Sequence, residues 1–137
     1  MSEENQQEAD KTPGIMSWQE LITGDIAGSI KFYTELLGYT TEAMEMGEGK
    51  SYTMFKTGDR YVGGMMEKPE GKGDAPTMWI NYITVEDLDA TVAKAEALGA
   101  SLCMPPTEVP GKGRFAGLAD PQGAPVAFWE FTGDGDC

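Results

Sequence analysis

The sequence predicts an α+β fold made of two tandem βαβββ modules, and three observations lead to this prediction. A strand-like segment runs into Asp25 and a helical pattern, and the same order returns at Asp87, close to half of the 137-residue chain later. Each helical pattern stops at a glycine, Gly38 or Gly99, and three short strand-like segments follow each of them. Such a repeat predicts a pseudo-two-fold arrangement, with a curved sheet around a shared cleft.

In the first module, residues 16–23 have the composition of a strand, and Asp25 is a candidate N-cap for the helix that follows. Apolar residues then recur at helical spacing until Gly38, whose residue type suits the position after a helix. Gly-rich turns divide the rest of the module into three strands. These strands are predicted at 39–46, 51–57 and 61–66.

The second module repeats this order. A strand is predicted at 78–85, and Asp87 caps a helix whose apolar face carries Leu88, Val92, Ala95 and Leu98. Pro105 and Pro106 interrupt the next segment, so we expect an edge or bulged strand there. The last three strands are predicted at 101–109, 114–119 and 126–131.

Composition sets the expected boundaries. Residues 1–14 are acidic and polar and are expected to form a disordered tail. The polar segment 68–76 is rich in Gly and Pro and is expected to link the modules at 15–67 and 77–132, with a short tail at 133–137. A chain of this length is expected to form one structural domain in total.

The charge of the chain limits its partners. The chain has 23 acidic and 10 basic residues and a formal net charge of −13, which repels nucleic acid and anionic membranes. No apolar stretch reaches the roughly 20 residues of a membrane span, and the N-terminus has no apolar signal-peptide core. Cys103 and Cys137 are expected to be free thiols in a reducing compartment, so we expect a cytoplasmic protein.

Three segments of the sequence resemble a known family. They are "SIKFYTELLGY" in the first half and "DLDATVAKAEALGA" and "DPQGAPVAFWE" in the second. They resemble the vicinal oxygen chelate superfamily, which includes glyoxalase I, the extradiol dioxygenases and the bleomycin-resistance proteins, and the resemblance covers roughly residues 16–132. With "WQELITGD" and "GDRYVGG", the chain further resembles an uncharacterised glyoxalase-like subgroup. Members commonly form dimers, so the resemblance implies a homodimer.

The resemblance also implies where a metal would bind. In metal-using members, four ligands come from the first and last strands of the two modules. By register these positions fall on Trp18, Gly63, Ile80 and Ala127. None of these side chains offers an oxygen, nitrogen or sulfur ligand of the kind a divalent metal needs, so we expect no metal and no other cofactor. A shift by one residue would offer Gln19 and Asn81, but strand alternation turns both toward the helices.

Strand alternation predicts which side chains face the cleft. The expected ligand-binding residues are Trp18, Ile22, Tyr61, Met65, Ile80, Thr84, Arg114 and Trp129. Glu20 and Tyr82 occupy matching places in the two modules and are the candidate catalytic pair, because a carboxyl and a phenol can exchange a proton. Four of these predicted site residues have a structural alternative. Trp18 and Trp129 could be core residues, and Glu20 could be a hydrogen-bonded or solvated carboxylate. Arg114 could form a surface ion pair and not an anion clamp.

These residues favour a metal-independent protein that binds a small organic molecule, aromatic or cationic, in an aromatic cleft. The alternative is an enzyme of the superfamily, of lyase, isomerase or dioxygenase type. It would use either a metal held by non-standard ligands or Glu20 as a base. A structural or regulatory protein without a ligand has no supporting motif in the sequence.

Overall fold

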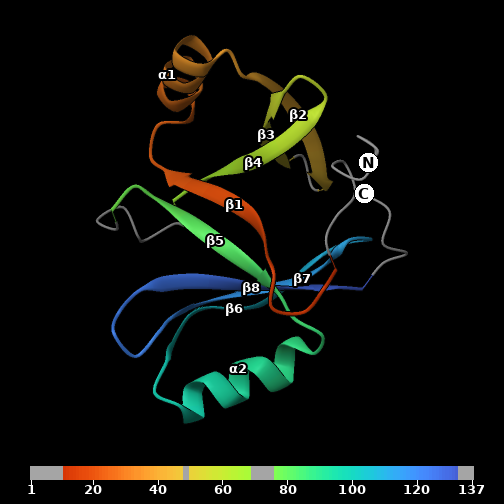
Figure 1. Ribbon diagram of the computed structural model, residues 1–137, viewed down its shortest axis with the longest axis vertical. Helices are drawn as coiled ribbons and strands as arrows, with labels where there is room; N and C mark the ends of the chain where they lie inside the picture. Colours follow the sequence, from red (N-terminus) through yellow and green to blue (C-terminus); the bar gives the residue numbers. More distant parts are fainter. Residues whose placement is uncertain (1–10, 48–49, 69–75, 133–137) are drawn as a thin grey trace. The chain divides into compact units, whose positions relative to one another are not determined.

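The computed structural model describes residues 11–47, 50–68 and 76–132, which form two compact units (Figure 1). The unit boundaries fall inside two strands, β1 (Met16–Thr23) and β5 (Met78–Thr84). Within the described ranges, the first unit runs from Gln19 to Ile80, and the second holds residues 11–18 and 81–132. The expected linker at 68–76 lies mostly outside the described residues.

The first unit is a four-stranded sheet with one helix. Strand β1 pairs in parallel with β4, and β2 and β3 continue the sheet through antiparallel ladders in the order β2-β3-β4-β1. Its other elements are α1 (Ile26–Leu37), β2 (Thr40–Gly47), β3 (Lys50–Thr57) and β4 (Arg60–Glu67). The predicted strand at 16–23 and the helix between Asp25 and Gly38 are confirmed.

Helix α1 covers one face of this sheet. Leu21, Phe55 and Met65 form the buried core, and Ile30 and Tyr33 of α1 pack against it. The helix begins where the Asp25 carboxylate accepts the Gly28 N–H at 2.9 Å, and ends at Gly38 in the left-handed conformation (φ 75°).

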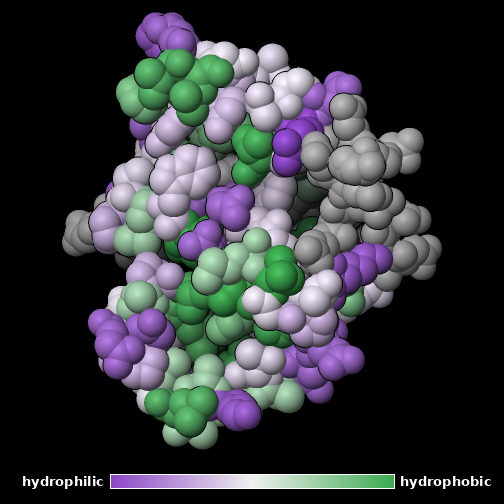
Figure 2. All heavy atoms as spheres, in the orientation of Figure 1, coloured by the Kyte–Doolittle hydropathy of each residue, from purple (hydrophilic) through white to green (hydrophobic). Residues whose placement is uncertain are grey.

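The outer side of α1 carries large exposed apolar side chains beside the exposed Lys31–Glu35 ion pair. Three of its large hydrophobic side chains are more than half exposed, and Figure 2 shows hydrophobic residues gathered over this helix. They are Phe32, Leu36 and Leu37.

The second unit has the same plan, with the strand order β5-β8-β7-β6. Its other elements are α2 (Leu88–Ala97), β6 (Ser101–Val109), β7 (Gly113–Ala119) and β8 (Pro125–Phe131). Strand β6 lies at the end of this order, and its ladder with β7 shifts register on both sides of Met104. The bulged edge strand predicted from Pro105 and Pro106 is therefore confirmed.

Helix α2 packs on this sheet through Leu88 and Val92, which contact Ala116 and Leu118 of β7. The helix has two acidic caps: Asp87 accepts the Ala90 N–H at 3.1 Å, and the Glu130 carboxylate accepts the Leu88 N–H at 2.7 Å. Leu98 was predicted on the apolar face of this helix, but it is the residue after the last helical position, Ala97, and is 69% exposed.

The N-terminal prediction was partly wrong. Residues 11–14 were expected to be disordered, but the Gly14 N–H donates to the Thr84 carbonyl at 2.8 Å, and the Thr84 N–H donates to the Ile15 carbonyl at 2.9 Å. Residues 1–10 and 133–137, with Cys137, lie outside the described residues. Neither helix in the described ranges is long and apolar enough to cross a membrane.

Candidate functional site

The sheet face opposite α1 carries the first group of polar side chains. Leu21 points into the core under α1, so its neighbour Glu20 points to the other face. The ladders then align Glu20 of β1 with Gly64 of β4, Met54 of β3 and Glu42 of β2 in one row. This row crosses the whole sheet of the first unit.

Glu20 is a buried carboxyl group with a phenol partner. It is 4% exposed, and the Tyr52 hydroxyl donates to its Oε1 at 2.6 Å, the distance of a charge-assisted hydrogen bond. We predicted Tyr82 as the partner of Glu20, but the phenol that the structure places on this carboxylate comes from β3 of the same unit. Tyr82 lies in the second unit, and its pairing with Glu20 stays a prediction.

Gly64 provides the space for this pair. A Cβ atom built at Gly64 would overlap the phenol ring and hydroxyl of Tyr52, so residue 64 must be glycine for the ring to lie there. The ladders pair Glu20 with Gly64 and Tyr82 with Ala127. Gly64 is therefore the repeat equivalent of Ala127.

The assignment of Gly63 to this position was wrong by one residue. The repeat offset is 62 residues from Glu20 to Tyr82 and 63 from Gly64 to Ala127, because the second module has one more residue between these strands, whereas Gly63 would require an offset of 64. Gly63 lies on the other side of the strand, where a Cβ would come within 3.5 Å of the Trp79 ring.

Tyr61 belongs to a second polar cluster of the first unit. Its hydroxyl donates to Glu42 Oε2 at 2.9 Å, and Lys56 Nζ lies 3.3 Å from Glu42 Oε1 and 5.0 Å from the Tyr61 ring centre. The hydrogen bond from Tyr61, followed by the hydrogen bond and the charge of Lys56, lowers the pKa of Glu42. The same bond raises the pKa of Tyr61.

Two predicted ligand-binding residues face the helices instead. Met65 is 2% exposed and packs with Leu21 in the core under α1, because it shares the register and the strand face of Leu21. Arg114 donates to both carboxylate oxygens of Asp89 on α2, at 3.0 and 3.2 Å. This pair lowers the pKa of Asp89 and raises that of Arg114. The surface ion pair was thus the correct alternative for Arg114.

The sheet face opposite α2 is aromatic. Phe128 packs toward α2, so Ala127 and Trp129 point the other way, and Tyr82 and Thr84 align with them. The Tyr82 ring lies 6.1 Å from that of Phe115, and the Trp129 ring 5.8 Å from that of Phe131. The Thr84 hydroxyl is buried and donates to Ser17 Oγ at 2.8 Å.

The remaining predicted residues are half-buried. Trp18 falls in the second unit and Ile80 in the first, and Ile22 aligns with Met66 across the β1–β4 ladder.

The residues at the family's metal positions do not fit a metal. With Gly64 in place of Gly63, the four positions still hold an indole, a hydrogen atom, a butyl and a methyl group, and none of these supplies a ligand atom. Among the described residues, no group of three or more His, Cys, Asp or Glu side chains lies close enough to hold an ion.

Sequence reasoning missed Tyr52. The only available signal was alternation along 51–57, which places Tyr52 and Met54 on one face. It does not state which residue of β1 lies opposite, because that depends on two inter-strand registers.

Comparison with known proteins agrees with this fold. The family model described as Glyoxalase/Bleomycin resistance protein/Dioxygenase superfamily matches residues 15–128. The chain is 42% identical over 111 residues to "Putative glyoxylase CFP32" of Mycobacterium tuberculosis, covering 81% of this chain and 42% of that protein. It is 33% identical over 129 residues to the anthracycline biosynthesis protein DnrV of Streptomyces peucetius, covering 85% and 47%. The chain thus spans less than half the length of these relatives.

A solved structure supports the fold independently. The protein BH1468 of Bacillus halodurans superposes with a TM-score of 0.64 over 92% of this chain and 100% of that chain, at 13% identity. A likeness at this identity concerns the fold alone. The match of the family model over most of the sequence shows that the chain belongs to the glyoxalase/bleomycin resistance protein/dioxygenase superfamily.

Proposed function

We propose that this member of the superfamily binds a small organic molecule without a metal at the family's ligand positions. The observation that carries the proposal is the content of those positions, where Trp18, Gly64, Ile80 and Ala127 have no ligand atoms. At one of them, the Tyr52 phenol occupies the space beside Gly64 and donates to Glu20. A hydrogen-bonded carboxylate thus lies beside a position that holds a metal ligand in metal-using relatives.

The sheet faces opposite the two helices favour an aromatic or cationic ligand. One face offers the Glu20 carboxylate with its Tyr52 donor, and the other offers the rings of Tyr82, Phe115 and Trp129. Aromatic surfaces suit flat ligands, and a carboxylate suits a positive charge or a hydrogen-bond donor. The name of DnrV suggests a probe, since an anthracycline combines a flat ring system with an amino sugar.

Calorimetry tests the proposal. Titration with an anthracycline and with a neutral anthraquinone, in the presence of a chelator, is expected to give saturable binding of at least one of them. The isosteric Glu20→Gln variant should weaken binding of the cationic compound more than that of the neutral one. If neither compound binds, or if the protein retains a stoichiometric metal whose removal abolishes binding, the proposal fails.

The second candidate function is metal-free proton transfer by Glu20, favoured by its 2.6 Å contact with the Tyr52 hydroxyl. A carboxylate could remove a proton from a bound substrate, and the phenol would hold the carboxylate in place. The names of the relatives suggest a first screen with thiol adducts of small ketoaldehydes. Any turnover found should be lost in Glu20→Gln, and an unchanged rate would exclude this role.

A homodimer and a cytoplasmic location remain predictions. Light scattering at two protein concentrations measures the mass in solution and decides the first of them.

A further inference from the structure

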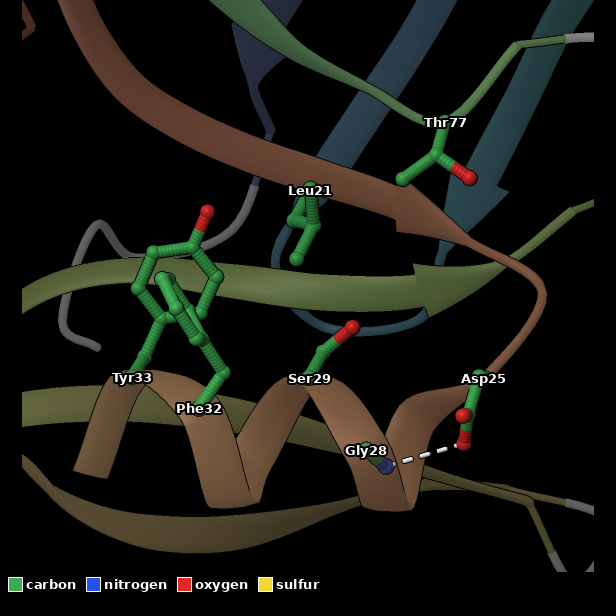
Figure 3. A pocket seen from close by; sticks show the side chains of 7 residues that line it. All are labelled: Leu21, Asp25, Gly28, Ser29, Phe32, Tyr33 and Thr77. Carbon is green, nitrogen blue, oxygen red and sulfur yellow. Dashed lines mark hydrogen bonds between the residues drawn. The ribbon is translucent and has the colours of Figure 1, made fainter. Parts of the chain in front are cut away.

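A shallow, largely open cavity of about 420 Å³ lies on the α1 side of the first unit (Figure 3). It lies between α1, strand β1 and the residue before β5, and it is lined by Leu21, Asp25, Ser29, Phe32, Tyr33 and Thr77. Because Leu21 and Glu20 are neighbours on one strand, they point to opposite faces of the sheet. The cavity is therefore distinct from the face that carries Glu20 and Tyr52.

The walls of the cavity are mainly apolar and aromatic. Leu21 is buried at its base, whereas Phe32 is 56% exposed at its side. Tyr33 is held by edge-to-face contacts, with ring centres 4.9 Å from Phe32 and 5.6 Å from Trp79. The Trp79 indole N–H also donates to the Tyr33 hydroxyl at 3.1 Å. The aromatic sides of this open cavity offer one face of a small ring-bearing molecule a surface to stack on.

The charge of the residues that line the cavity determines which sign of charge a ligand should carry. Among the described residues, Asp25 is the only charged one that lines the cavity, and one of its carboxylate oxygens accepts the Gly28 N–H. In the described part of the chain, no lysine or arginine nitrogen lies within 4.0 Å of this carboxylate; the stem of Lys68 passes beside Gly24 without forming an ion pair. The α1 N-terminus contributes about half a positive charge, which the full charge of Asp25 outweighs.

We infer that this cavity binds a small aryl- or alkylamine as its cation. The ammonium group would approach the Asp25 carboxylate and the Ser29 hydroxyl, and the apolar part would contact Phe32, Tyr33 and Leu21. A net charge of −13 favours cations over anions at every exposed site, and Asp25 adds a local carboxylate. The inference concerns a site separate from that of the proposed function.

The repeat supplies a matched control. Asp87 caps α2 as Asp25 caps α1, each through a side-chain oxygen that accepts the N–H three residues later. An asparagine can accept the same hydrogen bond and removes only the charge. Asp25→Asn and Asp87→Asn thus make the same change at equivalent helix starts, and only Asp25 lines the cavity.

The experiment titrates the full chain with three probes of one shape: phenethylamine, 2-phenylethanol and 3-phenylpropionate. Amide chemical shifts in two-dimensional NMR should move at Gly28, Ser29 and Thr77 with phenethylamine, and 3-phenylpropionate should bind at least about fivefold more weakly. Asp25→Asn should weaken phenethylamine binding about fivefold, and Asp87→Asn should leave it unchanged. Phe32→Ala should weaken all three probes, and its exposed position keeps the fold intact.

Equal affinity for the three probes, shifts confined to other residues, or equal effects of Asp25→Asn and Asp87→Asn would each overturn the inference. The shifts at Gly28, Ser29 and Thr77 report on this cavity, because these residues line it and Leu21 at its base points away from the face that carries Glu20. Failure at this cavity and failure of the proposed function are therefore separate results.

Discussion

Gly64 shows how a missing side chain positions a polar pair. The Tyr52 ring reaches Glu20 across β4 only because residue 64 has no Cβ. We expect Gly64→Ala to lower the free energy of unfolding by about 1–3 kcal/mol, the usual cost of forcing extra volume into a packed site. Urea denaturation measures this change in the free energy of unfolding. Gly24→Ala is the matched control and should change stability by less than about 0.5 kcal/mol, because its Cβ would meet only the Lys68 stem at 4.0 Å.

A double variant separates the clash from other effects. Removing the ring in Tyr52→Ala makes the space that a methyl group at position 64 needs, so adding Gly64→Ala to that background should cost much less than in the natural chain. Equal costs in both backgrounds would mean that the Tyr52 ring does not contact residue 64 in solution.

The pKa of Glu42 reports on the polar cluster that Glu42, Tyr61 and Lys56 form in the first unit. Its pKa is lowered first by the Tyr61 hydrogen bond and then by Lys56. In Tyr61→Phe and, separately, in Lys56→Met, the pKa of Glu42 should rise toward its ordinary value. A carbon-detected NMR titration of the glutamate carboxyl groups measures both. An unchanged pKa in Tyr61→Phe would show that the phenol does not hold this carboxylate in solution.

Residue-level roles were the least predictable part of the site. The alternation rule placed Glu20, Tyr82 and Trp129 on faces away from the helices, because it depends only on sequence parity within a strand. The partner of Glu20 depends on the register of β1 with β4 and of β4 with β3, which no local pattern encodes. Arg114 shares its parity on β7 with Ala116 and Leu118, which pack against α2, so alternation places it on the α2 side, where it contacts Asp89.

At the scale of elements, the helices and strands were predictable because their ends carry strong local signals. Asp25, Asp87, Gly38 and Gly99 mark the ends of the helical segments, and the turn residues separate the strands. The Pro105-Pro106 interruption also gave the correct bulged edge strand. The ordered turn at residues 11–14 could not be found this way, because backbone bonds to Thr84, far away in the sequence, hold it.

Arg114 and Asp89 join β7 to the start of α2. The pKa of Asp89 is lowered by Arg114, so the pair adds stability at pH values above the ordinary aspartate pKa of 3.8, and this contribution is lost as the pH falls through the lower folded-state pKa. Arg114→Gln should therefore lower the melting temperature at neutral pH. The difference from the natural chain should vanish in acid.

Thermal melts from about pH 7 to about pH 3 measure this difference. Arg60→Gln is the control, since Arg60 is exposed and forms no ion pair within the described ranges, and it makes the same change in net charge. If the two variants lose the same stability at every pH, the loss comes from net charge and not from the contact with Asp89.

At the scale of the whole molecule, the formal charge of −13 should be the largest electrostatic effect on stability. The described ranges contain four close ion contacts, and exposed pairs are each worth no more than about 1 kcal/mol. Repulsion among 23 acidic residues with only 10 basic ones acts over the whole surface and is screened beyond about 10 Å at 0.1 M salt.

Added salt weakens the few ion pairs and relieves the many repulsions, so the melting temperature should rise between low salt and 0.5 M NaCl. KCl should give the same rise, because screening depends on ionic strength and not on which cation is present. A melting temperature that falls with salt would mean that local ion pairs outweigh net charge, and the same result would weaken the electrostatic preference for cationic ligands.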